Sequence, residues 1–184
     1  MENWPVARLP ACAIFSFENH DRLTKEFVCY DCRMRIYLGA DHRGFELKEI
    51  VKEWLAQNEY EVEDTGDFVF NPDDDYVDYA LKVAESIEGN GETSRGILLC
   101  GSGHGVEMVA NRFPHVKAVL GFNDEVTVQG RQHEDANILV IPADWVNEVE
   151  VIERVRLFLE TEKLADARYE RRRIRVANLQ IRNS

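Results

Sequence analysis

The length of 184 residues fits one compact domain, or one domain with an extension, and excludes two large domains. Hydrophobic residues make up 45% of the chain and charged residues 30%, and no apolar run reaches the roughly 18 residues that a bilayer span requires. The composition therefore predicts a globular protein that neither inserts into a membrane nor is wholly disordered. A formal net charge of −12 would repel a phosphate backbone, which argues against a general nucleic-acid binder.

Positive charge gathers near the C-terminus of this acidic chain. Residues 164–184 contain six arginines against two acidic residues, Asp166 and Glu170. A local cluster of this kind can bind a small anion such as a phosphate group while the distant field stays negative. A solvated arginine-rich helix is the alternative, and the charge pattern alone does not decide between the two.

Residues 1–33 show neither sustained helical nor strand periodicity, and we treat them as an N-terminal extension of unknown role before a domain at 34–184. Met1 and Met34 are both candidate translation starts. The extension lacks the pattern of a secretory signal, which favours a cytoplasmic protein with reduced thiols. Cys29 and Cys32 form a CxxC pair without a convincing second half, so no zinc site or other metal site is predicted.

From Met34 onward, short apolar runs alternate with segments of helical periodicity. The predicted strands cover residues 35–39, 61–64, 96–100, 117–121 and 137–141. The predicted helices cover residues 47–55, 76–87, 106–113, a segment between the last two strands, 146–162 and the arginine-rich C-terminal segment. This alternation predicts an α/β fold: a three-layer Rossmann-like sandwich with a five-stranded parallel sheet flanked by helices, plus a C-terminal helix.

Polar residues follow the first three predicted strands, where parallel sheets bind ligands. They are Asp41, His42, Asp75, Tyr76 and the turn of residues 100–105, which contains Cys100, Gly101, Ser102, Gly103 and Gly105. The glycines let backbone amides point at an oxyanion, and the following helix start adds partial positive charge. The turn is neither a dinucleotide fingerprint nor a P-loop, so no nucleotide cofactor is predicted.

Each of these residues also has a structural interpretation. Amides and the helix dipole near Cys100 could lower the pKa of its thiol and favour a thiolate that acts as base or nucleophile. Alternatively, Cys100 could be a buried strand-end cysteine that acts as a small hydrophobic residue. Ser102 could donate a hydrogen bond to an oxyanion or cap the next helix. Asp41 could cap a loop, and His42 could be a surface histidine.

His133 lies just before the last predicted strand, so in one chain it falls at the opposite end of the sheet from Cys100. The two residues could share a site only if a second subunit presents its own His133. The alternative is a histidine that interacts with the C-terminal dipole of its helix.

Five motifs, taken in order and spacing, resemble one family. They are Gly39–Phe45 (GADHRGF), Asp75–Ala80 (DYVDYA), Gly96–Gly105 (GILLCGSGHG), Ala110–Arg112 (ANR) and His133–Asn137 (HEDAN). Over about residues 34–180 the chain resembles the sugar-phosphate isomerases that comprise type B ribose-5-phosphate isomerases and galactose-6-phosphate isomerase subunits.

The resemblance implies an isomerisation of ribose 5-phosphate to ribulose 5-phosphate, a step of the pentose phosphate pathway, through a cis-enediolate and without a metal or other cofactor. It implies a homodimer or a dimer of dimers with sites shared between subunits. In catalysis, Cys100 would move the proton, Ser102 would stabilise the enediolate, and Asp41 with His133 would open the furanose ring. The substrate-binding residues would be His42, Tyr76, Gly101, Gly103, Gly105, Glu134, Arg168 and Arg172.

Several positions depart from the family pattern. Glu134 replaces a usual asparagine, and Asp144 stands where an arginine is usual, so a negative charge would lie near the phosphate. Further departures are Val77, His104 and Tyr169. They leave open an isomerase of another tetrose, pentose or hexose phosphate, or a non-catalytic sugar-phosphate-binding subunit.

Overall fold

The computed structural model describes residues 34–90 and 93–179. The expectations for residues 1–33, including the Cys29 and Cys32 pair, lie outside the described residues. No helix within the described ranges is long and apolar enough to cross a membrane.

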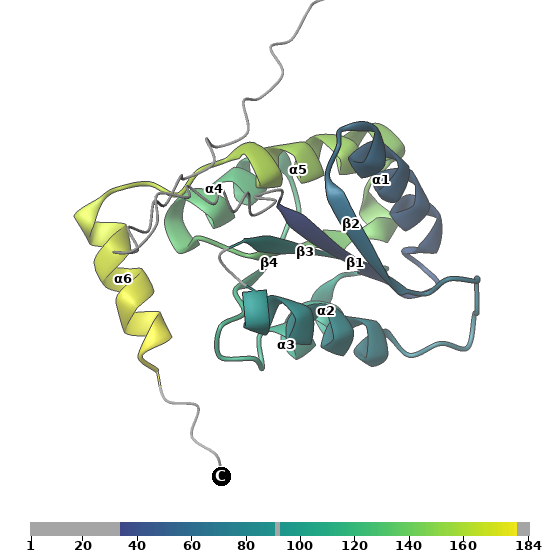
Figure 1. The fold of residues 1–184 in the computed structure, drawn as a ribbon, viewed down its shortest axis with the longest axis horizontal. Coiled ribbons are helices and arrows are strands. Elements are labelled where there is room, and N and C mark those ends of the chain that lie inside the picture. Colours follow the sequence, from purple (N-terminus) through teal and green to yellow (C-terminus); the bar gives the residue numbers. More distant parts are fainter. Residues whose placement is uncertain (1–33, 91–92, 180–184) are drawn as a thin grey trace, which may run out of the picture. The chain divides into compact units, whose positions relative to one another are not determined.

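The described residues form a parallel sheet between two layers of helices (Figure 1). The strands are β1 (Arg35–Ala40), β2 (Glu61–Gly66), β3 (Ser94–Cys100), β4 (Ala118–Leu120) and β5 (Ile138–Pro142). The helices are α1 (Phe45–Gln57), α2 (Tyr76–Asn90), α3 (His104–Ala110), α4 (Asp124–Glu134), α5 (Glu148–Glu160) and α6 (Ala167–Ala177), with a 3-10 turn at Ala143–Trp145. The predicted fold class is confirmed.

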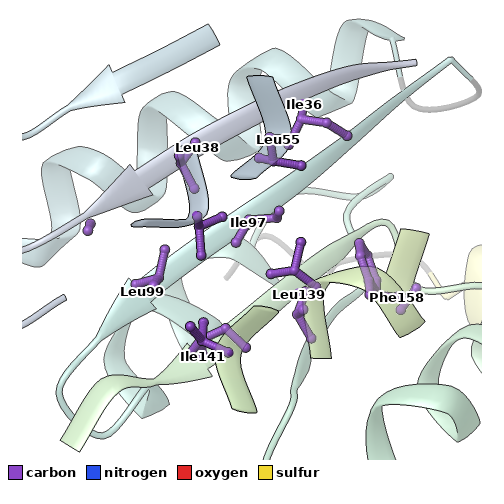
Figure 2. Close-up of a cluster of buried hydrophobic side chains, with 13 residues drawn as sticks. Ile36, Leu38, Leu55, Ile97, Leu99, Leu139, Ile141 and Phe158 are labelled. Carbon is purple, nitrogen blue, oxygen red and sulfur yellow. The ribbon is translucent and has the colours of Figure 1, made fainter. Parts of the chain in front are cut away.

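Each face of the sheet buries one set of alternating side chains, as the period of two in a strand requires. On β3, Ile97 and Leu99 face α1 and α5, whereas Leu98 and Cys100 face α2 and α3. Figure 2 shows the first of these clusters, in which aliphatic side chains of three strands meet Leu55 of α1 and others from α5. The side chain of Cys100 therefore lies on the face of the sheet that α2 and α3 cover.

The strand order is β2-β1-β3-β5-β4. The chain runs from β1 to β2 on one side and then crosses to β3 on the other side of β1. The strand order thus reverses direction at β1, and such a place is called a topological switch point. There the crossover connections go to opposite faces of the sheet and leave a crevice beyond the carboxyl ends of β1 and β3. Asp41 directly follows β1 and Cys100 ends β3, so both residues lie at this switch point.

Three helices begin elsewhere than predicted, among them α1, which begins at Phe45 rather than at residue 47. α5 begins at Glu148 rather than near residue 146, because Asn147 caps it: the Asn147 side chain accepts hydrogen bonds from the backbone of Val149 and Glu150, and the Glu150 side chain accepts from the Asn147 backbone. α3 begins at His104, before the predicted start at residue 106.

Among the residues that the structure describes, one charged side chain is fully buried. Lys48 of α1 has no exposed side-chain surface, and its Nζ donates hydrogen bonds to both carboxylate oxygens of Asp64, each at 2.9 Å, and to the backbone oxygen of Asp67 at 2.6 Å. Nζ also lies 5.4 Å from the centre of the Phe45 ring. The Lys48–Asp64 pair ties α1 to the end of β2, beside the switch point.

Candidate active site

Hydrogen bonds with the backbone hold Asp41 at the end of β1, beside β3. Its side chain is buried, and Oδ1 accepts hydrogen bonds from the backbone amides of Arg43 at 3.0 Å and Gly44 at 3.1 Å. The backbone amide of Asp41 donates to the carbonyl of Leu99 at 3.3 Å. The expected loop cap is therefore present, and it fixes the carboxylate next to the end of β3.

The thiol of Cys100 lies beside this carboxylate. Burial, followed by the interaction with Asp41, raises the pKa of the Cys100 thiol to about 12, although the backbone amides of Gly103 and Gly101 act in the opposite direction. The expectation of a lowered pKa and a resting thiolate is therefore wrong. With only 8% of the residue exposed, the loss of hydration outweighs the amide dipoles.

A side chain at each of the three glycines of the turn would meet a different obstacle. Gly103 has a φ of 79°, which side chains rarely adopt. At Gly101 a Cβ atom would come within 2.5 Å of the Arg43 Nε, and at Gly105 it would come within 2.6 Å of the Tyr76 ring. These close approaches bring Arg43 and Tyr76 against the turn that follows Cys100.

Ser102 is half-buried in this turn. The cap position of α3 is Gly103, and in this described stretch no side chain makes a capping hydrogen bond to α3. The interpretation of Ser102 as a helix cap is wrong, which leaves its hydroxyl free of that role.

Asp144 forms an ion pair that could not be predicted from the sequence. Arg43 donates a hydrogen bond from Nη2 to Oδ2 of Asp144, and the amide of Asp144 donates to the carbonyl of Gly101 at 3.0 Å. The negative charge that was expected to oppose a phosphate is therefore paired at the edge of the turn.

A second missed contact involves His42. Its Nδ1 lies 2.6 Å from Oδ1 of Asp74, whose side chain is 2% exposed. Asp74 belongs to the acidic loop between β2 and α2, and the hydrophilic run of residues 73–75 gave no sign that one of its members is buried. The histidine is thus anchored and is not a free surface residue.

A further group of predicted residues gathers where α4 ends and α6 begins. His133 stacks on Tyr169, with ring centres 4.2 Å apart and planes inclined by 8°. The guanidinium carbons of Arg168 and Arg172 lie 4.7 Å and 5.9 Å from the centre of the same Tyr169 ring. Both arginines are exposed, as is the adjacent Glu134.

Arg173, which is not among the residues expected to bind the substrate, links α6 to α4. Its Nη1 donates to the backbone oxygen of His133 at 3.1 Å, and its Nη2 forms an ion pair with Glu170 at 2.7 Å. Its side chain is 9% exposed, whereas its arginine neighbours point to solvent. The group around His133 is therefore assembled as a unit.

The two groups lie at opposite ends of the sheet. In the pairing of β3 with β5, Cys100 is opposite Pro142, and Gly96 is opposite Ile138, the first residue of β5 after His133. Parallel strands keep the carboxyl ends at one edge and the amino ends at the other. A single chain therefore brings Asp41, His42, Tyr76 and Cys100 to one edge, and it places His133 with the arginines at the other.

No group of three or more histidine, cysteine, aspartate or glutamate side chains within residues 34–90 and 93–179 is placed to hold a metal ion. At the switch point the structure offers instead a thiol, a carboxylate, a hydroxyl and backbone amides. These groups can move protons and stabilise an oxyanion. Fold and site together are those of an α/β enzyme that acts on a small polar substrate.

Comparison with known proteins specifies the class. A family model described as Ribose/Galactose Isomerase matches residues 36–177. A probable ribose-5-phosphate isomerase B of Mycoplasma genitalium is 36% identical over 137 residues, which cover 74% of this chain and 90% of the relative. A ribose-5-phosphate isomerase B of Mycobacterium tuberculosis is 34% identical over 139 residues, 76% of this chain and 85% of the relative.

Solved structures of ribose-5-phosphate isomerases have a similar fold. The crystal structure of ribose-5-phosphate isomerase B from Mycoplasma genitalium with bound ribulose-5-phosphate matches with a TM-score of 0.75 at 35% identity, covering 78% of this chain and 94% of that one. A ribose 5-phosphate isomerase from Thermotoga maritima also gives a TM-score of 0.75, at 38% identity, with 79% and 99% covered. This chain belongs to the ribose/galactose isomerase family and is an isomerase.

Proposed function

We propose that this chain interconverts ribose 5-phosphate and ribulose 5-phosphate in a site that a second copy of the chain completes. The observation that carries the proposal is the placement of the Cys100 thiol beside Asp41 at the switch point, next to the turn at Gly101 and Gly103. Relatives named ribose-5-phosphate isomerase B, one of them with bound ribulose-5-phosphate, support this substrate pair.

The reaction moves hydrogen between two neighbouring carbons. In the open-chain aldose, Cys100 as thiolate takes the proton from C2, and the C2–H electrons form the C1=C2 bond of an enediolate while the carbonyl electrons move to O1. The proton on O2 then passes to O1. Finally the Cys100 thiol returns its proton to C1, which leaves a ketone at C2 and a hydroxyl at C1.

Burial and the neighbouring Asp41 raise the pKa of the Cys100 thiol, so the thiol is the resting form and the formation of the thiolate adds to the barrier of the reaction. The Asp41 carboxylate lies against the thiol and is fixed by two backbone amides. Negative charge that develops on the enediolate would be stabilised by the Ser102 hydroxyl and the amides of Gly103 and Gly105.

Phosphate binding and ring opening need groups from the other edge of the sheet. His42 lies at the switch point, whereas Arg168 and Arg172 lie beside His133. A second copy that presents its His133 group to the first copy's switch point would complete a phosphate clamp and pair His133 with Asp41 for ring opening. Tyr76, packed on Gly105, would line the sugar pocket, and Glu134, adjacent to His133, would contact the sugar.

Mixing two inactive variants tests this shared site. Cys100→Ala and His133→Ala would each abolish isomerisation of ribose 5-phosphate as pure proteins. A mixed dimer has one site without either substitution, so an equal mixture that has exchanged subunits regains about one quarter of wild-type activity. No recovery from folded, mixed dimers would contradict the shared site, and a monomeric active enzyme in a light-scattering measurement would do the same.

We also propose that the protein is cytoplasmic, forms a homodimer and acts in the pentose phosphate pathway. The same assay tests the two alternatives, an isomerase of another sugar phosphate and a non-catalytic sugar-phosphate-binding subunit. Turnover of a different four- to six-carbon sugar phosphate would keep the mechanism and change the substrate. Binding of sugar phosphates without turnover by the wild type would replace the enzyme with a binding subunit.

A further inference from the structure

The loop between β2 and α2 buries a carboxylate whose role the sequence does not suggest. The three aspartates at 73–75 are adjacent, but Asp73 and Asp75 are exposed whereas the side chain of Asp74 is only 2% exposed. Asp74 Oδ1 lies 2.6 Å from His42 Nδ1. Asp74 Oδ2 is buried and has no hydrogen-bond partner among the described residues.

Burying a carboxylate costs free energy unless hydrogen bonds compensate for the lost hydration. For Asp74 the contact with His42 is that compensation, and it is short, as hydrogen bonds to ionised acceptors are. The phenol of Tyr79 faces the carboxylates of Asp74 and Asp67, and burial together with these two charges raises the pKa of Tyr79 to about 12. Tyr79 is therefore a neutral neighbour that adds no further charge beside Asp74.

The contact decides which nitrogen of His42 carries a proton. A carboxylate oxygen only accepts hydrogen bonds, so Nδ1 is the donor and Nε2 is the nitrogen left for a ligand. The His42 side chain is 32% exposed, and it directly follows Asp41 at the switch point. Nε2 then points away from Asp74 and can contact a phosphoryl oxygen without any rotation of the ring.

We propose that Asp74 is a positioning residue that holds His42 in one tautomer and one orientation for the phosphate group of the substrate. The inference rests on the proposed function, because it assigns to His42 a contact with the phosphate. Asp74 itself touches no substrate in this account and acts entirely through His42.

A double-mutant cycle tests whether Asp74 acts through His42. Asp74→Ala raises the KM for ribose 5-phosphate about tenfold and changes kcat less than about threefold, since the lost contact concerns binding. Asp74→Asn, which keeps an oxygen acceptor of the same shape, raises KM no more than about threefold. In a His42→Ala background, Asp74→Ala adds less than about a twofold change. Asp73→Ala, which removes an equal charge from the exposed neighbour, leaves the kinetic constants unchanged.

An NMR measurement tests the same inference without turnover. Long-range nitrogen–proton spectra of the wild type, assigned by comparison with His42→Ala, show the neutral His42 ring protonated at Nδ1. Asp74→Ala shifts the ring toward protonation at Nε2, and it weakens the binding of inorganic phosphate by the same factor as KM. Asp74→Asn is the second variant to be measured in case the alanine variant misfolds.

Two results would overturn the inference. The first is that the increases in KM caused by Asp74→Ala and His42→Ala multiply in the double variant, as the effects of independent residues do. The second is a neutral wild-type His42 ring that is protonated at Nε2. If the wild type fails to isomerise ribose 5-phosphate but its His42 ring is protonated at Nδ1 and loses phosphate affinity on Asp74→Ala, the proposed function fails and the positioning role stands.

Discussion

Asp144, which follows β5, forms an ion pair with Arg43, which follows β1, although 101 positions separate them in the sequence. The Arg43 side chain lies over Gly101, where a Cβ atom would collide with it. The pair thus closes one side of the turn that follows Cys100. It also uses a positive charge that would otherwise be available to a phosphate group.

Removing the charge of Asp144 should release Arg43. Asp144→Asn lowers the inhibition constant of inorganic phosphate about three- to tenfold, because one negative charge leaves the binding end of the sheet and one positive charge becomes free. Competition assays at low ionic strength measure the change, and 0.5 M salt largely removes it by screening. Unchanged phosphate affinity would show that the pair lies outside the site. Asp73→Asn serves as the control for net charge.

The Cys100 thiol makes stability depend on pH in a defined direction. The folded-state pKa of about 12 lies above the ordinary thiol pKa of 9.0, so the unfolded chain loses this proton first as pH rises. Stability due to this group is complete below pH 9, and above it the free energy of unfolding falls by about 1.4 kcal/mol per pH unit until pH 12.

Urea unfolding of wild type and Cys100→Ser between pH 8 and 10.5 isolates this effect, because serine does not ionise in that range. The difference in stability between the two proteins changes with pH only above about pH 9. A parallel test is alkylation by iodoacetamide, which reacts with the thiolate, followed at Cys100 alone by peptide mass spectrometry because the chain has three other cysteines. In the folded protein Cys100 reacts slowly at pH 8, and its rate is still rising at pH 10. A rate that reaches its plateau near pH 7 would contradict the raised pKa.

The buried Lys48 should be among the most sensitive positions of the fold. Lys48→Ala leaves the carboxylate of Asp64 without its fully buried partner and opens a cavity, and the expected loss is about 3–5 kcal/mol. Lys48→Met fills the space and costs less. Lys52→Ala removes a second partner of Asp64 whose side chain is 37% exposed, and it costs about 1 kcal/mol or less. Urea midpoints measure all three, and equal losses for Lys48→Ala and Lys52→Ala would refute the argument.

Tyr169 should act by orienting His133. Tyr169→Phe keeps the stacked ring and retains activity within about twofold, whereas Tyr169→Ala frees His133 and loses its contacts with Arg168 and Arg172. We expect kcat/KM to fall about tenfold or more for the alanine variant. Steady-state kinetics decide the matter, and equal activities of the two variants would exclude a role for the ring.

The sequence predicted the sheet well because its central strands are short apolar runs bounded by polar residues. It also singled out Asp41 and Cys100, because both lie where predicted strands end and parallel sheets bind ligands there. The strand order, and with it the switch point, is visible only in the structure. The sequence prediction failed where a charge is buried by distant residues. Lys48 looks like an exposed helix position, and Asp74 looks like part of a solvated acidic loop, yet both are enclosed by packing that no local pattern encodes.

The sign of the Cys100 pKa shift could not be predicted for a similar reason. Amide dipoles, which can be inferred from the glycine-rich turn, lower the pKa of the thiol, whereas burial and the Asp41 carboxylate raise it. The balance depends on how completely α2 and α3 cover the end of β3. That coverage becomes visible only in the folded structure.

The most direct test of the account is solvent-deuterium exchange at C2 of ribose 5-phosphate, followed by NMR, with wild type and Cys100→Ala compared at equal concentration. The account predicts exchange and conversion to ribulose 5-phosphate with the wild type, and neither with a folded Cys100→Ala protein that still binds inorganic phosphate. Exchange at an undiminished rate in Cys100→Ala would contradict the assignment of Cys100 as the group that moves the proton.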